Sequence, residues 1–335
     1  KLRLLIVGDY KEMPSEGMEV ITAAFYNRAR SKGISSTSFS QKSVLTRLFK
    51  VISFSPHIAI FTHGPGIGTF YITTLLKIIF PKLYIYWVGS RPDINKIPNI
   101  PSWLPKVDCI YVGKDNDTLF NYAAKNHVTV KREIIGIDMN RISTNRPKQR
   151  NTYLSRFFSE MEFYEGMPTL LHVGHVRKSR GLDLLVELKL KLQKKVNILV
   201  IASPSLSYDR DLYKKLLDSQ ISVYRKYLSN LSDVYKCADL YLFPLDPQAG
   251  GAIDFPLSVI EALACELPVI STDFGALREN LDNVPGIVFT DRENFLDMTV
   301  ANLGNTKTQT FGASSLPKKF DLNYLIDGIL DNHVL

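Results

Sequence analysis

The sequence predicts an α/β protein with two lobes, each built on a doubly wound parallel sheet. Three observations support this fold class. The 335 residues exceed what one ordinary hydrophobic core holds and suit two domains. Apolar runs of strand length alternate with segments of helical periodicity, as in successive βα units. The alternation stops in a polar, charge-rich stretch at 140–166 and then starts again. We therefore expect two Rossmann-like lobes.

In the first half, each expected strand is a short apolar run that ends at a polar or glycine-containing turn. Strands are expected at 1–8, 58–62, 83–88, 109–112 and 134–137. Helices are expected at 17–30 and 70–80, and a third helix follows the strand at 109–112 and ends at 126. We assign 1–140 to the first domain and 141–168 to a linker. A C-terminal helix at about 320–335 is expected to pack back on the first domain.

The second half, 169–319, repeats the pattern as a second domain. Strands are expected at 170–173, 198–202, 240–243 and 268–271, with a short one starting at Val223, and helices at 181–192, 211–217, 234–237 and 257–265. Ligands of such sheets bind beyond the carboxyl ends of the strands, so the turns after strands are the first places to look for chemistry.

The composition is that of a folded, soluble protein, with 45% apolar and 22% charged residues. Cys109, Cys237 and Cys265 match no zinc or disulfide spacing, and we interpret them as small core residues in a reducing, cytoplasmic compartment. No signal peptide is expected. Residues 51–76 carry no charged side chain, but a glycine-rich run from Gly64 to Gly68 interrupts them. Strand, turn and helix is therefore expected there, in place of a membrane span.

The charge is unevenly distributed. Residues 1–150 hold 22 Lys and Arg against 10 Asp and Glu, and residues 151–335 hold 19 against 23. The net charges of +12 and −4 together give the overall +8. Such a basic half is typical of a domain that faces a polyanion or an anionic membrane. The alternative is that scattered lysines only confer solubility.

The turn after the expected strand at 170–173 combines positive charge with a helix start. It contains His175, Arg177, Lys178 and Arg180, and it ends at Gly181. Cations beside free helix N–H groups suit a diphosphate. An ordinary basic surface turn would have the same composition.

A second candidate segment runs from Phe255 to Gly275. The backbone N–H groups of Leu257 and Ser258 would be free at a helix start and could bind phosphate. Glu261, one turn further, could accept hydrogen bonds from a ribose diol. The alternative is that Glu261 is an acid favoured there by the helix dipole.

The order of these motifs resembles the retaining GT-B glycosyltransferases of family 4 (group 1). The resemblance rests on the turn 174–181, the segment Ala238–Pro244 and the run from Phe255 to Thr272, which contains Glu261-Ala-Leu-Ala-Cys and Leu267-Pro-Val-Ile. It implies two lobes facing across a cleft, transfer with retention, and no metal or other cofactor. It also implies that Arg180 binds the diphosphate, that Glu261 binds ribose, and that Tyr227 or Leu228 lies next to the base.

The sequence departs from the family pattern at the sugar end of the site. His175 replaces the first arginine, so Arg177 or Lys178 would supply its charge. Ile253 stands where the first glutamate belongs, with Asp254 beside it, and Val88 replaces a sugar-contacting histidine. Either Asp254 and the loop from Arg91 to Asp93 substitute, or the donor sugar differs, or the protein binds nucleotide without efficient transfer. We place Asp254, Arg180 and Lys178 in the catalytic set.

The first domain is expected to bind the acceptor. Gly17, His63, Arg91 and Asp93 are its candidate residues, although His63 would equally suit a turn with a satisfied side chain. Residues 42–54 interleave Lys42, Arg47 and Lys50 with apolar residues, as in an interfacial amphipathic helix; core packing with extended lysines is the alternative. The resemblance implies that a lipid-linked acceptor would be reached through this domain.

We therefore expect a glycosyltransferase that moves a sugar from a UDP- or GDP-sugar to a glycan or glycolipid, either in the cytoplasm or peripherally on the inner face of a membrane. Two alternatives stay open, a nucleotide-sugar epimerase of the same fold and a membrane-associated pseudo-transferase. A nucleic-acid partner is not expected, because the basic half shows no recognition motif.

Overall fold

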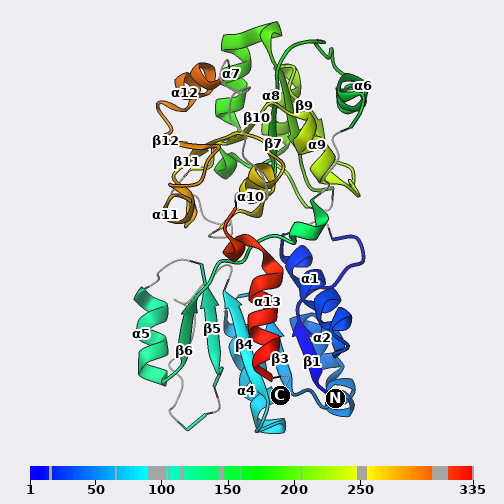
Figure 1. Ribbon diagram of the computed structural model, residues 1–335, viewed down its shortest axis with the longest axis vertical. Helices are drawn as coiled ribbons and strands as arrows, with labels where there is room; N and C mark the ends of the chain where they lie inside the picture. The colour runs from blue at the N-terminus through cyan, green and yellow to red at the C-terminus, as the bar shows by residue number, and fades with distance from the viewer. Residues whose placement is uncertain are drawn as a thin grey trace. The chain divides into compact units, whose positions relative to one another are not determined.

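The computed structural model describes residues 1–14, 17–64, 66–89, 103–104, 106–113, 117–142, 147–158, 160–204, 206–246, 255–303 and 316–333. The chain divides into two compact units. The first contains residues 1–138 and 318–335, and the second contains most of 139–317. Each unit has a six-stranded sheet whose paired strands are parallel, with helices packed around it (Figure 1). The predicted doubly wound α/β fold is confirmed.

The first sheet has the strand order β2-β1-β3-β4-β5-β6. Its strands are β1 (Arg3–Val7), β2 (Ser35–Phe39), β3 (Ile58–Phe61), β4 (Tyr84–Gly89), β5 (Cys109–Val112) and β6 (Thr129–Arg132). The helices are α1 (Gly17–Ser31), α2 (Gln41–Thr46), α3 (Leu48–Phe54), α4 (Ile67–Ile79), α5 (Asp117–Asn126) and α13 (Leu322–Leu330). Central strands such as β1 and β3 are completely buried over most of their length. Because both faces of such a strand are buried, its residues are apolar in succession, and the strand can be predicted from the sequence.

The second sheet has the order β12-β11-β10-β7-β8-β9. Its strands are β7 (Thr169–Val173), β8 (Asn197–Ile201), β9 (Ser222–Tyr224), β10 (Leu240–Phe243), β11 (Val269–Thr272) and β12 (Ile287–Thr290). The helices are α6 (Arg150–Ser155), α7 (Asp183–Leu192), α8 (Arg210–Asp218), α9 (Leu231–Cys237), α10 (Leu257–Ala264), α11 (Leu277–Leu281) and α12 (Phe295–Asn302).

Three expectations from the sequence differ from the structure. The strand expected at 134–137 is instead β6, at Thr129–Arg132, because an edge strand is half solvated and needs no apolar run. The segment expected as a linker carries α6 and the short helix η3 (Arg156–Phe158), and it lies in the second unit. The amphipathic helix expected at 42–54 is broken at Arg47 into α2 and α3.

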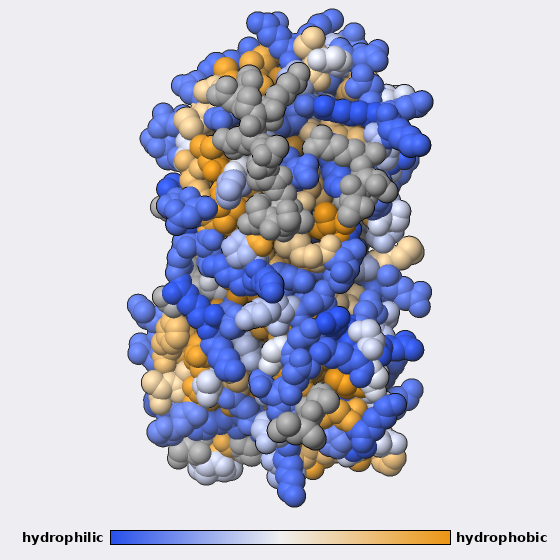
Figure 2. Space-filling view, in the orientation of Figure 1, coloured by the Kyte–Doolittle hydropathy of each residue, from blue (hydrophilic) through white to orange (hydrophobic). Residues whose placement is uncertain are grey.

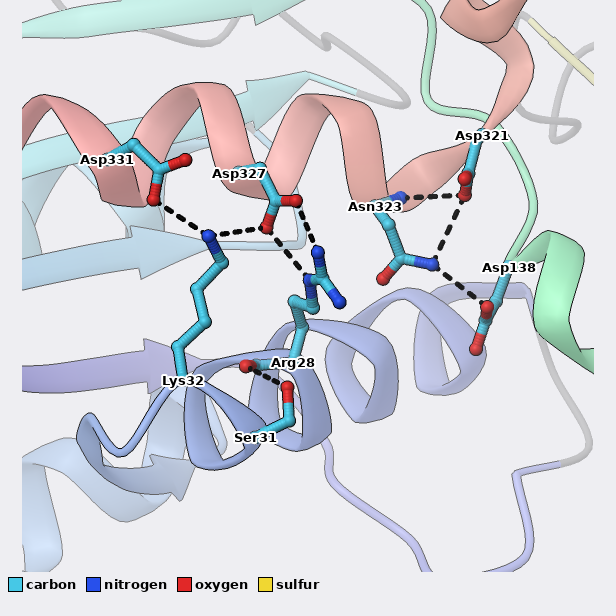
Figure 3. A network of polar contacts seen from close by, with 8 residues as sticks. All are labelled: Arg28, Ser31, Lys32, Asp138, Asp321, Asn323, Asp327 and Asp331. Atoms are coloured by element: carbon cyan, nitrogen blue, oxygen red, sulfur yellow. Dashed lines mark hydrogen bonds and ion pairs between the residues drawn. The ribbon is translucent and has the colours of Figure 1, made fainter.

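The C-terminal helix α13 lies along α1 in the first unit (Figure 1). Asp327 accepts hydrogen bonds from Arg28, one of them at 2.8 Å from Nε, and forms an ion pair with Lys32 at 3.1 Å. Lys32 also pairs with Asp331 at 2.7 Å. Nearer the helix start, the Asn323 amide donates to Asp138 at 3.0 Å (Figure 3). Helix α13, near the end of the chain, is thus joined by polar contacts to the C-terminal end of α1 and to Asp138.

The surface differs between regions. On the face drawn in Figure 2, hydrophilic side chains predominate and apolar ones form separate groups. In the first unit, α2, α3 and α4 expose large apolar side chains, namely Leu45, Phe49, Ile52, Ile67, Tyr71 and Ile78. Within the described part of the chain, none of the helices is both long and apolar enough to cross a membrane.

Candidate functional site

In the second unit, the strand order reverses at the carboxyl ends of β7 and β10. β7 pairs with β8 on one side and with β10 on the other. Ligands of doubly wound sheets bind beyond the strand ends at such a reversal. Two chain segments lie there. We call residues 174–182 the β7 turn, and residues 256–258, at the beginning of the helix that follows β10, the α10 start.

The β7 turn is held close to the end of β10, and Gly181 makes this possible. The φ angle of Gly181 is +67°, and a Cβ atom added there would lie 1.9 Å from the carbonyl oxygen of Pro244. Because that obstacle is backbone, only glycine fits without a shift of the chain. At the other end of the turn, the Gly174 N–H donates to the Ile201 carbonyl at 3.0 Å. The turn is therefore fixed at both ends.

The four basic residues of the β7 turn differ in burial. Arg180 is only 9% exposed, whereas Arg177 and Lys178 are exposed and His175 is half-buried. Burying a guanidinium is costly unless its charge is compensated. Arg180 is thus a buried cation with a restricted side chain. Arg177 and Lys178 are exposed, so their side chains can reorient toward a ligand.

The α10 start offers backbone donors. The helix begins at Leu257 after Pro256, whose side chain makes no capping hydrogen bond. The first N–H groups of a helix have no partner inside the helix, and together with the helix dipole they attract anions. Leu257 is buried and Ser258 is half-buried. The residues selected from the sequence for phosphate binding therefore occupy a helix N-terminus.

Glu261 lies one turn further along α10 and is half-buried. Its Oε2 accepts a hydrogen bond from the hydroxyl of Tyr235 on α9 at 3.0 Å. Burial raises the pKa of the Glu261 carboxyl, while the hydrogen bond from Tyr235 and the positive charge of Arg141 act in the opposite direction. Tyr235, which sequence reasoning missed, thus holds one oxygen of the carboxylate that we selected for ribose.

Tyr241 was also missed, because its side chain lies inside the sheet. It is completely buried on β10, and its hydroxyl donates to the Val173 carbonyl at the end of β7 at 3.2 Å. Burial raises the pKa of Tyr241, so the phenol stays neutral. The Tyr241 hydroxyl therefore joins β10 to the end of β7.

His172 lies beside Tyr241, with the two rings stacked at 6.4 Å between centroids. Its Nδ1 donates to the Leu242 carbonyl at 2.9 Å, so Nε2 is the unprotonated nitrogen. A Cβ atom added at Gly174 would lie 2.7 Å from Nε2, which places this nitrogen directly under the β7 turn. Burial, together with the nearby charges of Arg180 and His175, lowers the pKa of His172 to about 4, although the hydrogen bond to Leu242 acts in the opposite direction.

The segment expected to flank the base follows β9. Tyr227 is 37% exposed and Leu228 is half-buried. Arg225, which the sequence did not single out, lies with its guanidinium 3.9 Å above the ring of Tyr208 and donates to the Leu206 carbonyl at 3.0 Å. The loops after β8 and β9 are thereby joined at this edge of the sheet.

The acceptor-side candidates lie in the first unit. Gly17 is the first residue of α1. His63 follows β3, with its Nδ1 3.4 Å from the Thr62 hydroxyl and its carbonyl accepting from Thr69 at 3.3 Å. Arg91 and Asp93, like Asp254 and Ile253, lie outside the described residues.

The three cysteines are free and buried, as predicted. Among the described residues, no group of His, Cys, Asp and Glu has the arrangement of a metal site.

Comparison with known proteins confirms the resemblance in the second half of the chain. Residues 167–305 match the model of the family described as glycosyl transferases group 1. No curated protein matches the sequence. The matched segment contains the β7 turn, the α10 start and Glu261, so these parts of the site lie where the chain is similar to group 1 glycosyltransferases.

Similar solved structures cover both units. HepE of Anabaena in complex with UDP is 12% identical, covers 99% of each chain and has a TM-score of 0.68. Sucrose-phosphate synthase of Thermosynechococcus elongatus is 10% identical over 98% of this chain and 94% of that chain, with a TM-score of 0.66. A glycosyltransferase of Rickettsia africae is 13% identical over 99% of each chain, with a TM-score of 0.66. The GT-B architecture of two Rossmann-like units is thereby confirmed.

Proposed function

We propose that this glycosyltransferase moves a sugar from a UDP- or GDP-sugar to a glycan or glycolipid acceptor, with retention of configuration. One observation carries the proposal. At the carboxyl ends of β7 and β10, a buried arginine, an uncapped helix N-terminus and a half-buried carboxylate occur on adjoining segments. These are the groups that a diphosphate and a ribose need.

The chemistry follows from the charge that develops on the leaving group. As the bond between the anomeric carbon and the diphosphate breaks, Arg180, Lys178 and the N–H groups of the α10 start would stabilise the diphosphate. The acceptor hydroxyl attacks from the same face, a new glycosidic bond forms, and the hydroxyl proton passes to the diphosphate. Arg177 and His175 add positive charge nearby. Asp254 is the proposed sugar-facing carboxylate, and no metal is needed.

The choice of donor rests on the site and on related structures. HepE was solved with UDP and also with UDP-glucose. Glu261 would hold the ribose, and Tyr227 or Leu228 would lie next to the base. The first unit, with Gly17, His63, Arg91 and Asp93, would bind the acceptor.

Calorimetry tests the donor site directly. UDP, GDP, ADP and their sugars are titrated into the wild-type chain and into a variant with both Arg180→Ala and Glu261→Ala. We expect binding of a UDP or GDP series, abolished in the variant, and activity that persists in EDTA. The anomeric configuration of the product, determined by NMR, tests retention. Equal affinity of wild type and variant would contradict the site assignment.

A second candidate function is a pseudo-transferase that binds nucleotide without transfer. It is favoured by one observation, that Ile253 stands where the family has its first glutamate. The two functions separate in one assay, because a pseudo-transferase would bind the donor yet neither hydrolyse nor transfer it.

We also propose that the first unit docks on an anionic membrane, where a lipid-linked acceptor would be found. Leu45, Phe49 and Ile52 of α2 and α3 are 55%, 87% and 43% exposed. The basic side chains Lys42, Arg47 and Lys50 between them are exposed too. Helix α4 lies against α2, where Gln41 donates to Thr69 at 2.9 Å, and it adds the exposed Ile67, Tyr71 and Ile78. Exposed apolar side chains that alternate with cations along a helix suit an anionic interface.

Liposome sedimentation tests this docking surface. Binding to vesicles containing phosphatidylglycerol should exceed binding to neutral vesicles, and it should weaken with salt. Phe49→Ser should reduce binding about tenfold, because one aromatic side chain leaves the interface. Leu190→Ser is the matched control, since Leu190 is 65% exposed in the second unit. Equal losses in both variants would contradict the proposal.

A further inference from the structure

Arg225 lies on the same edge of the second sheet as the proposed phosphate site. It follows β9 directly, and Tyr208 lies in the loop after β8. Because β7, β8 and β9 are parallel neighbours, their carboxyl ends share one edge (Figure 1). Neighbouring strands are about 4.8 Å apart, so the end of β9 lies about 10 Å from the end of β7. A nucleotide whose diphosphate occupies the β7 turn is long enough to bring its base to this position.

The guanidinium of Arg225 is held in one orientation. Its Cζ lies 3.9 Å from the centroid of the Tyr208 ring, and its Nη2 donates to the Leu206 carbonyl at 3.0 Å. Tyr208 in turn packs against Tyr213 of α8, with 5.0 Å between the ring centroids. A guanidinium that is stacked and tethered in this way loses little freedom when it binds a ligand.

Most of the hydrogen-bonding capacity of Arg225 is unused. A guanidinium carries several N–H donors and no acceptor. Within the described part of the chain, its only hydrogen bond is the one to Leu206, and its Nε is buried without an acceptor. An arginine with a purely structural role is expected to have its buried donors satisfied. The unused donors therefore point to a ligand that offers acceptor atoms.

The edges of the nucleobases differ in what they offer to such donors. Uracil and guanine present a carbonyl oxygen, O4 or O6, which only accepts hydrogen bonds. Cytosine and adenine present an amino group, on N4 or N6, at the same place on the ring. An arginine can donate to the carbonyl oxygen, whereas it would meet the amino group as donor against donor.

We propose that Arg225 is a specificity-determining residue of the donor site: its guanidinium donates to O4 of uracil or O6 of guanine and thereby disfavours nucleotides of cytosine and adenine, and Tyr208 positions it. This inference rests on the proposed function of the site and deepens it, because it names the class of base that the site accepts. Tyr227 or Leu228 would lie against the base, and Arg225 would read its edge.

Calorimetry with two pairs of nucleotides tests the inference. UDP, CDP, GDP and ADP are titrated into the wild type and into Arg225→Met, which keeps an apolar chain on Tyr208 and removes every donor. The wild type should bind UDP more tightly than CDP, or GDP more tightly than ADP, by about tenfold or more. In Arg225→Met this preference should fall by about tenfold, because the loss of affinity falls on the member of the pair with the carbonyl oxygen.

Lys226→Met is the matched control, because it removes an exposed cation from the next position in the chain. It should change the affinities for both members of a pair alike and leave the preference intact. An equal loss for both members in Arg225→Met would show that Arg225 contributes only charge or stacking. That result, or an unchanged preference, would overturn the inference.

A second variant and a double-mutant cycle keep the test decisive. Arg225→Lys keeps the charge but loses the planar fork, so it should also lower the preference, and it replaces Arg225→Met if that variant shows no cooperative melting. Tyr208→Leu should lower the same preference, with no added effect in Arg225→Met. An additive effect would overturn the positioning role of Tyr208.

The wild type separates this inference from the proposed function. Failure to bind any of the four diphosphates would overturn the proposed function together with the inference. Binding of CDP as tight as that of UDP, or of ADP as tight as that of GDP, would overturn the inference and leave the diphosphate site standing.

Discussion

The turns after β7 and after β3 each lie where the strand order of their sheet reverses, yet their residues differ. Each turn leaves a buried parallel strand where the strand order reverses and leads toward a helix. The turn after β7 carries Arg177, Lys178 and Arg180, whereas Thr62, His63 and Gly64 after β3 carry no full charge. The fold therefore creates a potential ligand-binding position in both units. The side chains at that position determine whether it can bind an anion such as a diphosphate.

The largest expected effect is a loss of kcat, and it should be greater for the buried Arg180 than for the exposed Arg177. Arg180→Ala should lower kcat by about 10²–10³, the usual loss when one preorganised donor to developing charge is removed. Arg177→Ala, three residues earlier and exposed, should lower it less than tenfold, since water and Lys178 can compensate. Steady-state kinetics with a saturating donor measures both. Equal losses would show that burial of Arg180 does not distinguish it.

The next effect concerns the neutral histidine under the β7 turn. Burial lowers the pKa of His172 from 6.5 to about 4. The unfolded chain therefore binds a proton below pH 6.5 that the folded chain excludes, and stability falls as the pH drops from 6.5 to 4. The loss is about 3 kcal/mol over this range. His172→Gln should remove that part of the pH dependence in urea unfolding, and an unchanged slope would show that His172 titrates normally.

The glycines of the two turns provide a third test. In Gly181→Ala the new Cβ would meet the Pro244 carbonyl, whereas in Gly64→Ala it would first meet the Thr69 hydroxyl at 2.7 Å, which belongs to a side chain. Both residues have positive φ, so both substitutions add strain. We expect Gly181→Ala to cost about 2 kcal/mol or more and to weaken nucleotide binding, and Gly64→Ala to cost about 1 kcal/mol. Thermal unfolding with and without UDP measures both effects.

The same contrast explains what the sequence could and could not predict. The β7 turn and the α10 start were found because buried strands read as apolar runs and because cations and glycines mark the turns between elements. The edge strands β2, β6 and β12 were missed, since half-solvated strands such as Ser35–Phe39 lack that signature. The contacts of Tyr235 with Glu261 and of His172 with Leu242 join residues 26 and 70 positions apart, and only the packing of the sheet and helices brings them together.

The smallest expected effect compares ion pairs in the two units. Asp327 on α13 binds both Arg28 and Lys32, and the hydrogen bond from Arg28, followed by that from Lys32, lowers the pKa of its carboxyl. A lowered carboxyl pKa contributes stability that is complete above the unfolded value and is lost as the pH falls through the folded one. Asp327→Asn should therefore cost about 1 kcal/mol at pH 7 and almost nothing at pH 3. Asp297→Asn breaks the single pair of Asp297 with Lys191, whose side chains are 76% and 51% exposed, and it should cost close to nothing at either pH. Urea unfolding of both variants at the two pH values makes the comparison. A pH-independent loss in Asp327→Asn would mean that α13 is held by its buried apolar face rather than by its ion pairs with α1.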